Sequence, residues 1–154
     1  MDNVADLAVN WSITTGGNVS ATPAVDGQHV YFPDWAGNLF KADRDTGEVI
    51  WMKSIADDYT GVAGNFSRTT PAVYQDALIF GDQGGRLFAG ARVMSVDAKT
   101  ADLNWSTSVG NHPFAIVTQS ATVHANVVYV GWPPSRRHSP PLFRITSAVH
   151  SRAR

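Results

Sequence analysis

Few side chains in this 154-residue sequence are of the kinds that carry out chemistry. The chain has no cysteine, which excludes disulfides, thiol nucleophiles and thiolate-bound metals. Three of the five histidines, His29, His112 and His124, lack metal-ligand spacing, so we expect them to be structural or exposed. The sequence also shows no Ser/His/Asp set, phosphate-binding glycine loop or zinc signature.

The strongest remaining candidate is Arg68, which stands at the start of the short segment Thr69–Val73. A guanidinium is a planar fork of donors that suits a carboxylate or an ortho-quinone. A solvated loop arginine is the plainer interpretation, and the spacing leaves both open. Asp34 and Asp82 could be hard-metal ligands or a base, but a turn aspartate more often caps the local backbone.

The elements that position these residues belong to a repeated unit with a period near 50 residues. Ala42–Trp51 indicates a strand end, a tight turn at Gly47 and a new strand that closes on a tryptophan. The pattern recurs as Val96–Trp105, and Thr22–Val25 recurs 48 residues later as Thr70–Val73. Four short strands in each period predict the blades of a β-propeller.

Three tryptophans, Trp11, Trp51 and Trp105, occupy the same position near the end of successive units. We also expect a strand over residues 9–13, because Val9, Trp11 and Ile13 alternate with polar residues. Repetition at one phase predicts that each tryptophan docks between neighbouring blades and buries its ring. The alternative, a row of stacking platforms for a ligand, is disfavoured by that regularity.

The propeller geometry also predicts which loops lie together. In a blade, the turn between the second and third strands opens on the same face as the link to the next blade. Four segments are then expected on one loop-rich face: Pro33–Trp35, Gly64–Arg68, Gly81–Gly84 and Pro113–Gln119. Arg68, at the start of an innermost strand, could therefore reach the central axis.

The charge is unevenly distributed along the chain. Residues 1–131 carry seven basic and 13 acidic side chains, a net charge of −6, which does not suit nucleic-acid binding. Residues 132–154 carry five arginines, no acid and no continuation of the repeat. We therefore expect a partial propeller over residues 1–131 and an aberrant basic tail over residues 132–154. A shifted reading frame or alternative exon would explain the tail, and a disordered linker is the alternative.

No apolar run approaches the roughly 18 residues that a membrane helix needs, so no membrane span is expected. The first residues, Met1–Asp6, lack the basic and apolar regions of a signal peptide. The chain is therefore either intracellular or begins downstream of its natural start, and the compartment stays unknown.

The stretch Ala42–Trp51 resembles the tryptophan-docking motif of pyrroloquinoline quinone (PQQ)-type propellers. Val19–Leu39 is similar to polyvinyl-alcohol-dehydrogenase-like proteins, and Ser67–Val73 and Asn104–Thr118 support the same resemblance. The similarity covers residues 4–131. It implies an all-β, eight-bladed propeller of four-stranded antiparallel blades, of which this chain holds about two complete blades and parts of two more.

The resemblance also implies a cofactor and an activity. Family members hold PQQ on the axis at the loop-rich face, usually with Ca²⁺, and oxidise alcohols. By position, Arg68 matches an arginine that contacts the quinone, and Thr118 lies near one of its side-chain partners. This sequence has Gly64–Ser67 where many members carry a cysteine pair, and the expected calcium-binding glutamate after Gly131 falls in the aberrant tail. We therefore assign no metal ligand within this chain.

Two functions remain open. The first is a fragment of a PQQ-dependent alcohol dehydrogenase-like protein, inactive alone, whose parent acts on small or polymeric alcohols. The alternative is a non-catalytic propeller that binds protein partners, like the outer-membrane assembly lipoproteins that share the docking motif. Exposed blade edges would favour self-association, and the family is secreted or periplasmic.

Overall fold

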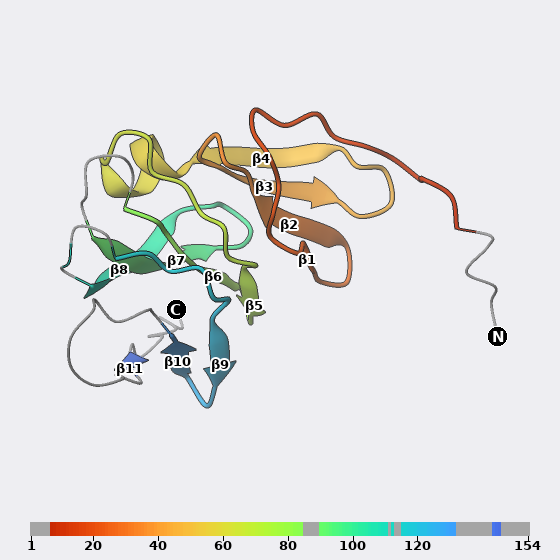
Figure 1. Ribbon diagram of the computed structural model, residues 1–154. Coiled ribbons are helices and arrows are strands. Elements are labelled where there is room, and N and C mark those ends of the chain that lie inside the picture. The colour runs from red at the N-terminus through yellow and green to blue at the C-terminus, as the bar shows by residue number, and fades with distance from the viewer. Residues whose placement is uncertain (1–6, 85–89, 111, 113–114, 132–142, 146–154) are drawn as a thin grey trace.

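The computed structural model describes residues 7–84, 90–110, 112, 115–131 and 143–145 as three successive antiparallel sheets (Figure 1). Blade 1 contains β1 (Ala24–Val25), β2 (His29–Pro33), β3 (Asn38–Asp43) and β4 (Val49–Ser54). Blade 2 contains β5 (Ala72–Tyr74), β6 (Ala77–Gly81), β7 (Ala91–Asp97) and β8 (Leu103–Gly110). Blade 3 contains β9 (Thr122–His124), β10 (Val127–Val130) and β11 (Phe143–Ile145).

Within each sheet the strands lie side by side in chain order. The predicted all-β fold of four-stranded antiparallel blades is confirmed, as a partial propeller. A short π-helix, η2 (Ile55–Thr60), leads from β4 towards blade 2. Within the described residues, no helix is long and apolar enough to cross a membrane.

Aspartates at the strand ends shape the repeated turns. After β3, the Asp43 carboxylate accepts hydrogen bonds from the backbone N–H groups of Asp45 and Thr46 at 2.9 and 2.8 Å. Asp97 repeats this arrangement after β7. In the first of these turns Gly47 has φ +74°, and a Cβ there would lie 2.7 Å from the Trp11 ring. The repeat in sequence is therefore a repeat in turn geometry. We call the face of the propeller that carries these β3–β4 and β7–β8 turns the turn face.

The core lies between the blades. Between blades 1 and 2, apolar side chains of both sheets form one buried cluster that includes Tyr31, Leu39, Leu78, Phe80 and Met94. A second cluster joins blades 2 and 3 and includes Ile79, Val93, Val117, Val128 and Val130. Each blade thus depends on its neighbour for burial, as expected for a repeat array.

The tryptophans dock as the spacing predicts. Trp11 Nε1 donates to the carbonyl of Arg44 at 2.7 Å, and Trp51 Nε1 donates to the carbonyl of Ala98 at 3.4 Å. Both acceptors occupy the same place in successive turns, directly after the capping aspartate. Trp105 packs between blades 2 and 3, but its buried Nε1 has no acceptor among the described residues. These rings are structural, and the interpretation as ligand platforms is not supported.

Some expectations differ from the structure. Residues 9–13 are not a strand, because no described strand lies beside them; Trp11 and Ile13 alternate because they pack on the apolar face of blade 1. The expected loop over Asp57–Asn65 begins within η2, whose N-cap Ser54 accepts from the Asp57 N–H. Three residues of the expected tail, Phe143–Ile145, pair with β10. Residues 132–142 and 146–154 lie outside the described residues, so the boundary after residue 131 stays a prediction.

Replacing the docking tryptophan of β4 tests the blade interface. We expect Trp51→Ala to lower the free energy of unfolding by about 3 kcal/mol, because a large interblade ring and its hydrogen bond are lost together. Met52→Ala is the matched control, since Met52 is 54% exposed on the same strand and should change stability by less than about 0.5 kcal/mol. Urea unfolding measures both, and equal effects would refute interblade docking by Trp51.

Candidate functional site

The loop-rich face forms where blade 1 meets blade 2. The Trp35 ring, in the β2–β3 turn of blade 1, lies 6.2 Å from the ring of Phe66 in the link to blade 2. The carbonyl of Phe66 accepts from the Gln83 N–H of the β6–β7 turn at 3.1 Å. The Val117 N–H, in the link to blade 3, donates to the carbonyl of Asp82 at 2.9 Å. The structure therefore brings together all four segments expected on this face, as far as they are described.

Arg68 lies on this face with its guanidinium 4.9 Å from the centre of the Trp35 ring. Trp35 is 42% exposed, and its Nε1 donates to Ser20 Oγ at 2.9 Å, which fixes the orientation of the ring. Arg68 itself is exposed and forms no ion pair with a described carboxylate. Stacking on an aromatic ring holds a guanidinium while leaving its N–H groups available. Arg68 is thus a positioned cation with donors to offer a ligand.

Thr118 is exposed, next to the buried Val117 that anchors its segment to blade 2. No contact joins the Thr118 and Arg68 side chains in the part of the chain that is described. The assignment of both residues to a cofactor stays a prediction. The stacking of Arg68 on Trp35 was missed from the sequence, because 33 residues separate them.

Asp34 and Asp82 are buried caps. Asp34 accepts from the Gly16 N–H at 3.1 Å and the Asn38 N–H at 2.8 Å. Asp82 accepts from the Asn65 side-chain amide at 2.7 Å and from the Arg92 N–H. Burial raises the pKa of Asp82, although these hydrogen bonds oppose the shift. Asp34 thus holds the segment before blade 1 against the β2–β3 turn, and Asp82 holds the link between blades 1 and 2 against the β6–β7 turn. These contacts favour the capping interpretation over a metal ligand.

Two buried polar atoms on the loop-rich face, Asn65 Oδ1 and Gln83 Nε2, have no hydrogen-bond partner among the residues that the structure describes. An unsatisfied buried group is costly, but both atoms are enclosed by protein and cannot reach a bound molecule. The exposed donors of Arg68 are the groups on this face that would suit a carboxylate or quinone oxygen, as PQQ carries. For Ca²⁺ the fit is poor, since the described residues hold no group of three or more carboxylates and histidines that could bind a metal.

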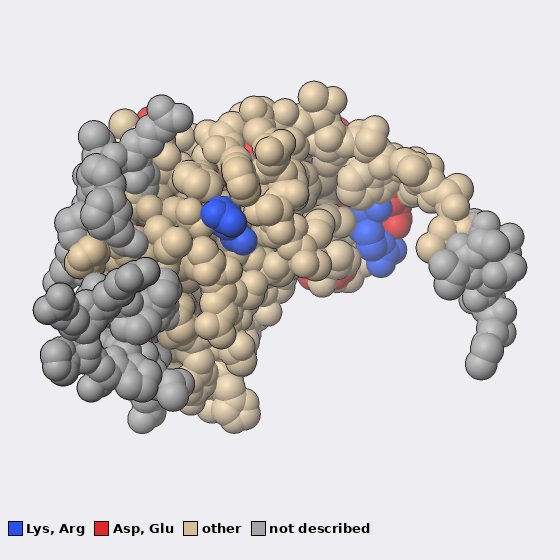
Figure 2. Space-filling view, viewed as in Figure 1, with Lys and Arg blue, Asp and Glu red and all other residues tan. Residues whose placement is uncertain are grey.

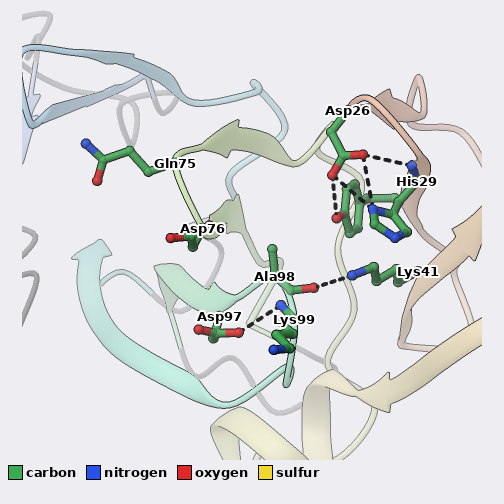
Figure 3. A pocket seen from close by; sticks show the side chains of 9 residues that line it. Asp26, His29, Lys41, Gln75, Asp76, Asp97, Ala98 and Lys99 are labelled. Carbon is green, nitrogen blue, oxygen red and sulfur yellow. Dashed lines mark hydrogen bonds and ion pairs between the residues drawn. The ribbon is translucent and has the colours of Figure 1, made fainter.

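A separate cavity of about 620 Å³ opens on the turn face, between blades 1 and 2 (Figure 3). On its blade 1 side, the Asp26 carboxylate accepts from the Tyr31 hydroxyl at 2.8 Å and lies 3.1 Å from His29 Nδ1. Lys41 donates across the interface to the carbonyl of Ala98 at 3.0 Å. The remaining lining residues are Gln75, Asp76, Asp97 and Lys99. This cavity was not predicted from the sequence, because its two walls are about 50 residues apart.

His29, His112 and His124 are structural or exposed, as the sequence predicted. His29 is held by Asp26, and His112 and His124 are exposed on separate segments. Partial burial alone would raise the pKa of Asp26, but hydrogen bonds from the Gln28 N–H, the Tyr31 hydroxyl and His29 outweigh it and lower the pKa from 3.8 to about 2. Burial and the same hydrogen bond raise the pKa of the Tyr31 hydroxyl.

The depressed pKa of Asp26 predicts a pH dependence of stability. The ionised carboxylate stabilises the fold above the unfolded-state pKa near 4, and this contribution is lost as the pH falls towards 2. We therefore expect Asp26→Asn to destabilise the protein at neutral pH and to have a shrinking effect between pH 4 and pH 2. Urea unfolding across that range measures it, with exposed Asp45→Asn as the control. An unchanged difference at pH 2 would contradict the assignment.

Comparison with known proteins places these features in context. The PQQ-repeat family model described as outer membrane protein assembly factor BamB matches residues 3–132. XoxF of Paracoccus denitrificans, a protein named as a dehydrogenase, is 30% identical over 131 residues, covering 79% of this chain and 20% of that protein.

Solved structures show the same fold. A quinohemoprotein alcohol dehydrogenase from Pseudomonas putida HK5 superposes with a TM-score of 0.60 and 22% identity, covering 79% of this chain and 18% of its own. BamB from Moraxella catarrhalis gives 0.58 and 19%, covering 79% of this chain and 36% of its own. This chain thus spans about a fifth of the dehydrogenases and about a third of that BamB. With the family model matching most of its length, the chain belongs to the PQQ-repeat family of β-propellers.

Proposed function

We propose that this chain is part of the propeller of a PQQ-dependent alcohol dehydrogenase-like protein. The observation that carries the proposal is Arg68, a cation stacked on Trp35 with its donors exposed on the loop-rich face. The similarity to XoxF over 79% of the chain supports it. The chain spans a fifth of that relative, so the alcohol substrate, small or polymeric, belongs to the whole protein.

In this proposal, Arg68 donates hydrogen bonds to a quinone or carboxylate oxygen, and Trp35 keeps the guanidinium in place. Thr118 would offer a hydroxyl from the neighbouring link. When bound, PQQ supplies an acceptor for the two electrons released by alcohol oxidation. Ca²⁺ ligands and a catalytic base would come from outside the described residues, which hold no such cluster. The chain alone is accordingly expected to be inactive.

A second candidate is a non-catalytic scaffold that binds protein partners. The family model described as BamB, and the fold shared with BamB from Moraxella catarrhalis, favour it. Exposed apolar side chains on β4, namely Val49, Ile50 and Met52, offer a surface for a partner or for self-association.

Titration with PQQ in the presence of Ca²⁺ separates the two candidates. We expect the full chain to bind PQQ with quenching of tryptophan fluorescence, and Arg68→Ala to weaken binding by about tenfold or more, because a charge-assisted contact is lost. Arg68→Lys should recover only part, since an ammonium lacks the planar fork.

Arg44→Ala is the matched control, because Arg44 is also an exposed arginine but lies in the β3–β4 turn on the turn face. It should leave PQQ binding unchanged. Equal binding by wild type and Arg68→Ala would refute the assigned role of Arg68. An absence of binding by the folded chain would refute the cofactor proposal for this chain and favour the scaffold.

A further inference from the structure

The segment before blade 1 lies where the fourth strand of a preceding blade would lie. Trp11 Nε1 in this segment donates to the carbonyl of Arg44, the first residue after the aspartate that caps the β3–β4 turn. Trp51, in the fourth strand of blade 1, donates in the same way to the carbonyl of Ala98, the first residue after the capping aspartate of blade 2. Residues 7–13 are therefore placed against blade 1 as β4 is placed against blade 2.

This segment has the open backbone of an unpaired strand. Within the described part of the chain, residues 7–13 pair with no strand, and their backbone N–H and C=O groups form no hydrogen bond. Leu7 and Val9 are 81% and 86% exposed, and Figure 2 shows the N-terminal end of this segment standing away from the body of the molecule. Unpaired backbone groups along a strand are a template for pairing with another chain.

Blade 3 has the complementary opening. In blades 1 and 2 the third strand pairs on one side with the second strand and on the other side with a fourth. In blade 3, β11 takes the place of the third strand, and no described strand lies on its outer side. Figure 1 places β11 and residues 7–13 at opposite ends of the three sheets, so these two edges of one copy cannot meet each other. A second copy can supply the fourth strand.

The outer face of blade 3 is apolar at the position that blades 1 and 2 bury. Tyr31 in β2 and Ile79 in β6 are 1% and 0% exposed, because each packs against the following blade. Tyr129 has the same cross-strand register in β10 but is 39% exposed. Its ring therefore lies where a following blade would cover it.

The outer face of blade 1 is the counterpart at the other end of the array. Val30 and Phe32 of blade 1 correspond to Leu78 and Phe80 of blade 2, which are fully buried against the preceding blade. No described blade precedes blade 1, and Val25, the cross-strand partner of Val30, is 57% exposed. The first and last blades thus present faces of the kinds that join blades 1 and 2.

We propose that two copies of this chain associate head to tail. Residues 7–13 of one copy pair with β11 of the other and complete its blade 3 with a fourth strand. The outer face of blade 1 of the first copy then packs against the Tyr129 face of that blade. Each such contact leaves a free strand at one end and an open blade 3 at the other, so the contact is heterologous and can repeat. It is independent of Arg68 and of any cofactor on the loop-rich face.

Sedimentation velocity of the full chain over a concentration series tests this contact, and we expect the mass of the wild type to rise with concentration. The double change Ala8→Pro and Val9→Pro should raise the dissociation constant at least about tenfold. Successive N–H groups of a strand point to opposite edges, so the two prolines remove a donor whichever edge pairs.

Blocking the other side of the contact should have the same effect. Tyr129→Glu places a charge on the outer face of blade 3 and should also weaken association at least about tenfold. Leu103→Glu is the matched control, because Leu103 is similarly exposed, at 41%, but lies on blade 2. This control should associate as the wild type does.

Mixing the two blocked variants is the decisive measurement. The proline variant keeps an intact blade 3 and the Tyr129→Glu variant keeps an intact strand, so an equal mixture should form heterodimers and stop there. A wild type that stays monomeric at its highest soluble concentration would overturn the proposal. So would a mixture that stays monomeric, or blocked variants that associate like the wild type, which would indicate pairing through the edges of β4 or β8.

Discussion

The docking of a tryptophan from one blade onto the backbone carbonyl of the next is the contact on which the rest of this structure depends. A four-stranded blade cannot bury both of its faces alone, so its core exists only against a neighbour. Trp11 reaches the carbonyl of Arg44, and Trp51 reaches that of Ala98. Both acceptors hold the same place in their turns; Trp51 joins blades 1 and 2, whereas Trp11 lies in the unpaired segment before blade 1. The interface between blades 1 and 2 also brings Trp35 and Arg68 into contact on the opposite face.

The interface between blades 1 and 2 carries an additional polar element. The carbonyl of Ala98 accepts from Trp51 Nε1 and from Lys41 Nζ, so one oxygen holds two side chains of blade 1. Lys41 occupies a position in β3 whose counterpart in β7 is Ser95, which is also buried. The lysine that lines the turn-face cavity is therefore not repeated in blade 2, although the docking motif is shared.

The sequence predicted the features that repeat from blade to blade, and it missed the side-chain contacts that occur only once. The period, the capping aspartates and the phase of the tryptophans are local patterns, and they were sufficient to assign blades and faces. The alternation of apolar and polar residues around Trp11 led to a wrong prediction of a strand. Alternation shows which side chains face a surface, but it does not show whether the backbone pairs with another strand. The contacts of Lys41 and Arg68 cross from blade to blade over long sequence separations, and depend on a register that only the assembled sheets provide. The assignment of Thr118 to a bound cofactor remains a prediction.

The buried Nε1 of Trp105, without an acceptor among the described residues, shows how stability is shared along such an array. A hydrogen bond of this kind left unmade costs about 1–3 kcal/mol. By analogy with Arg44 and Ala98, the carbonyl that would satisfy Trp105 belongs to the turn after β11, which lies outside the described residues. In a nearest-neighbour description, every added turn lowers the free energy of the blade before it as well as its own. The Trp51–Ala98 contact is the instance of this coupling that the described residues show.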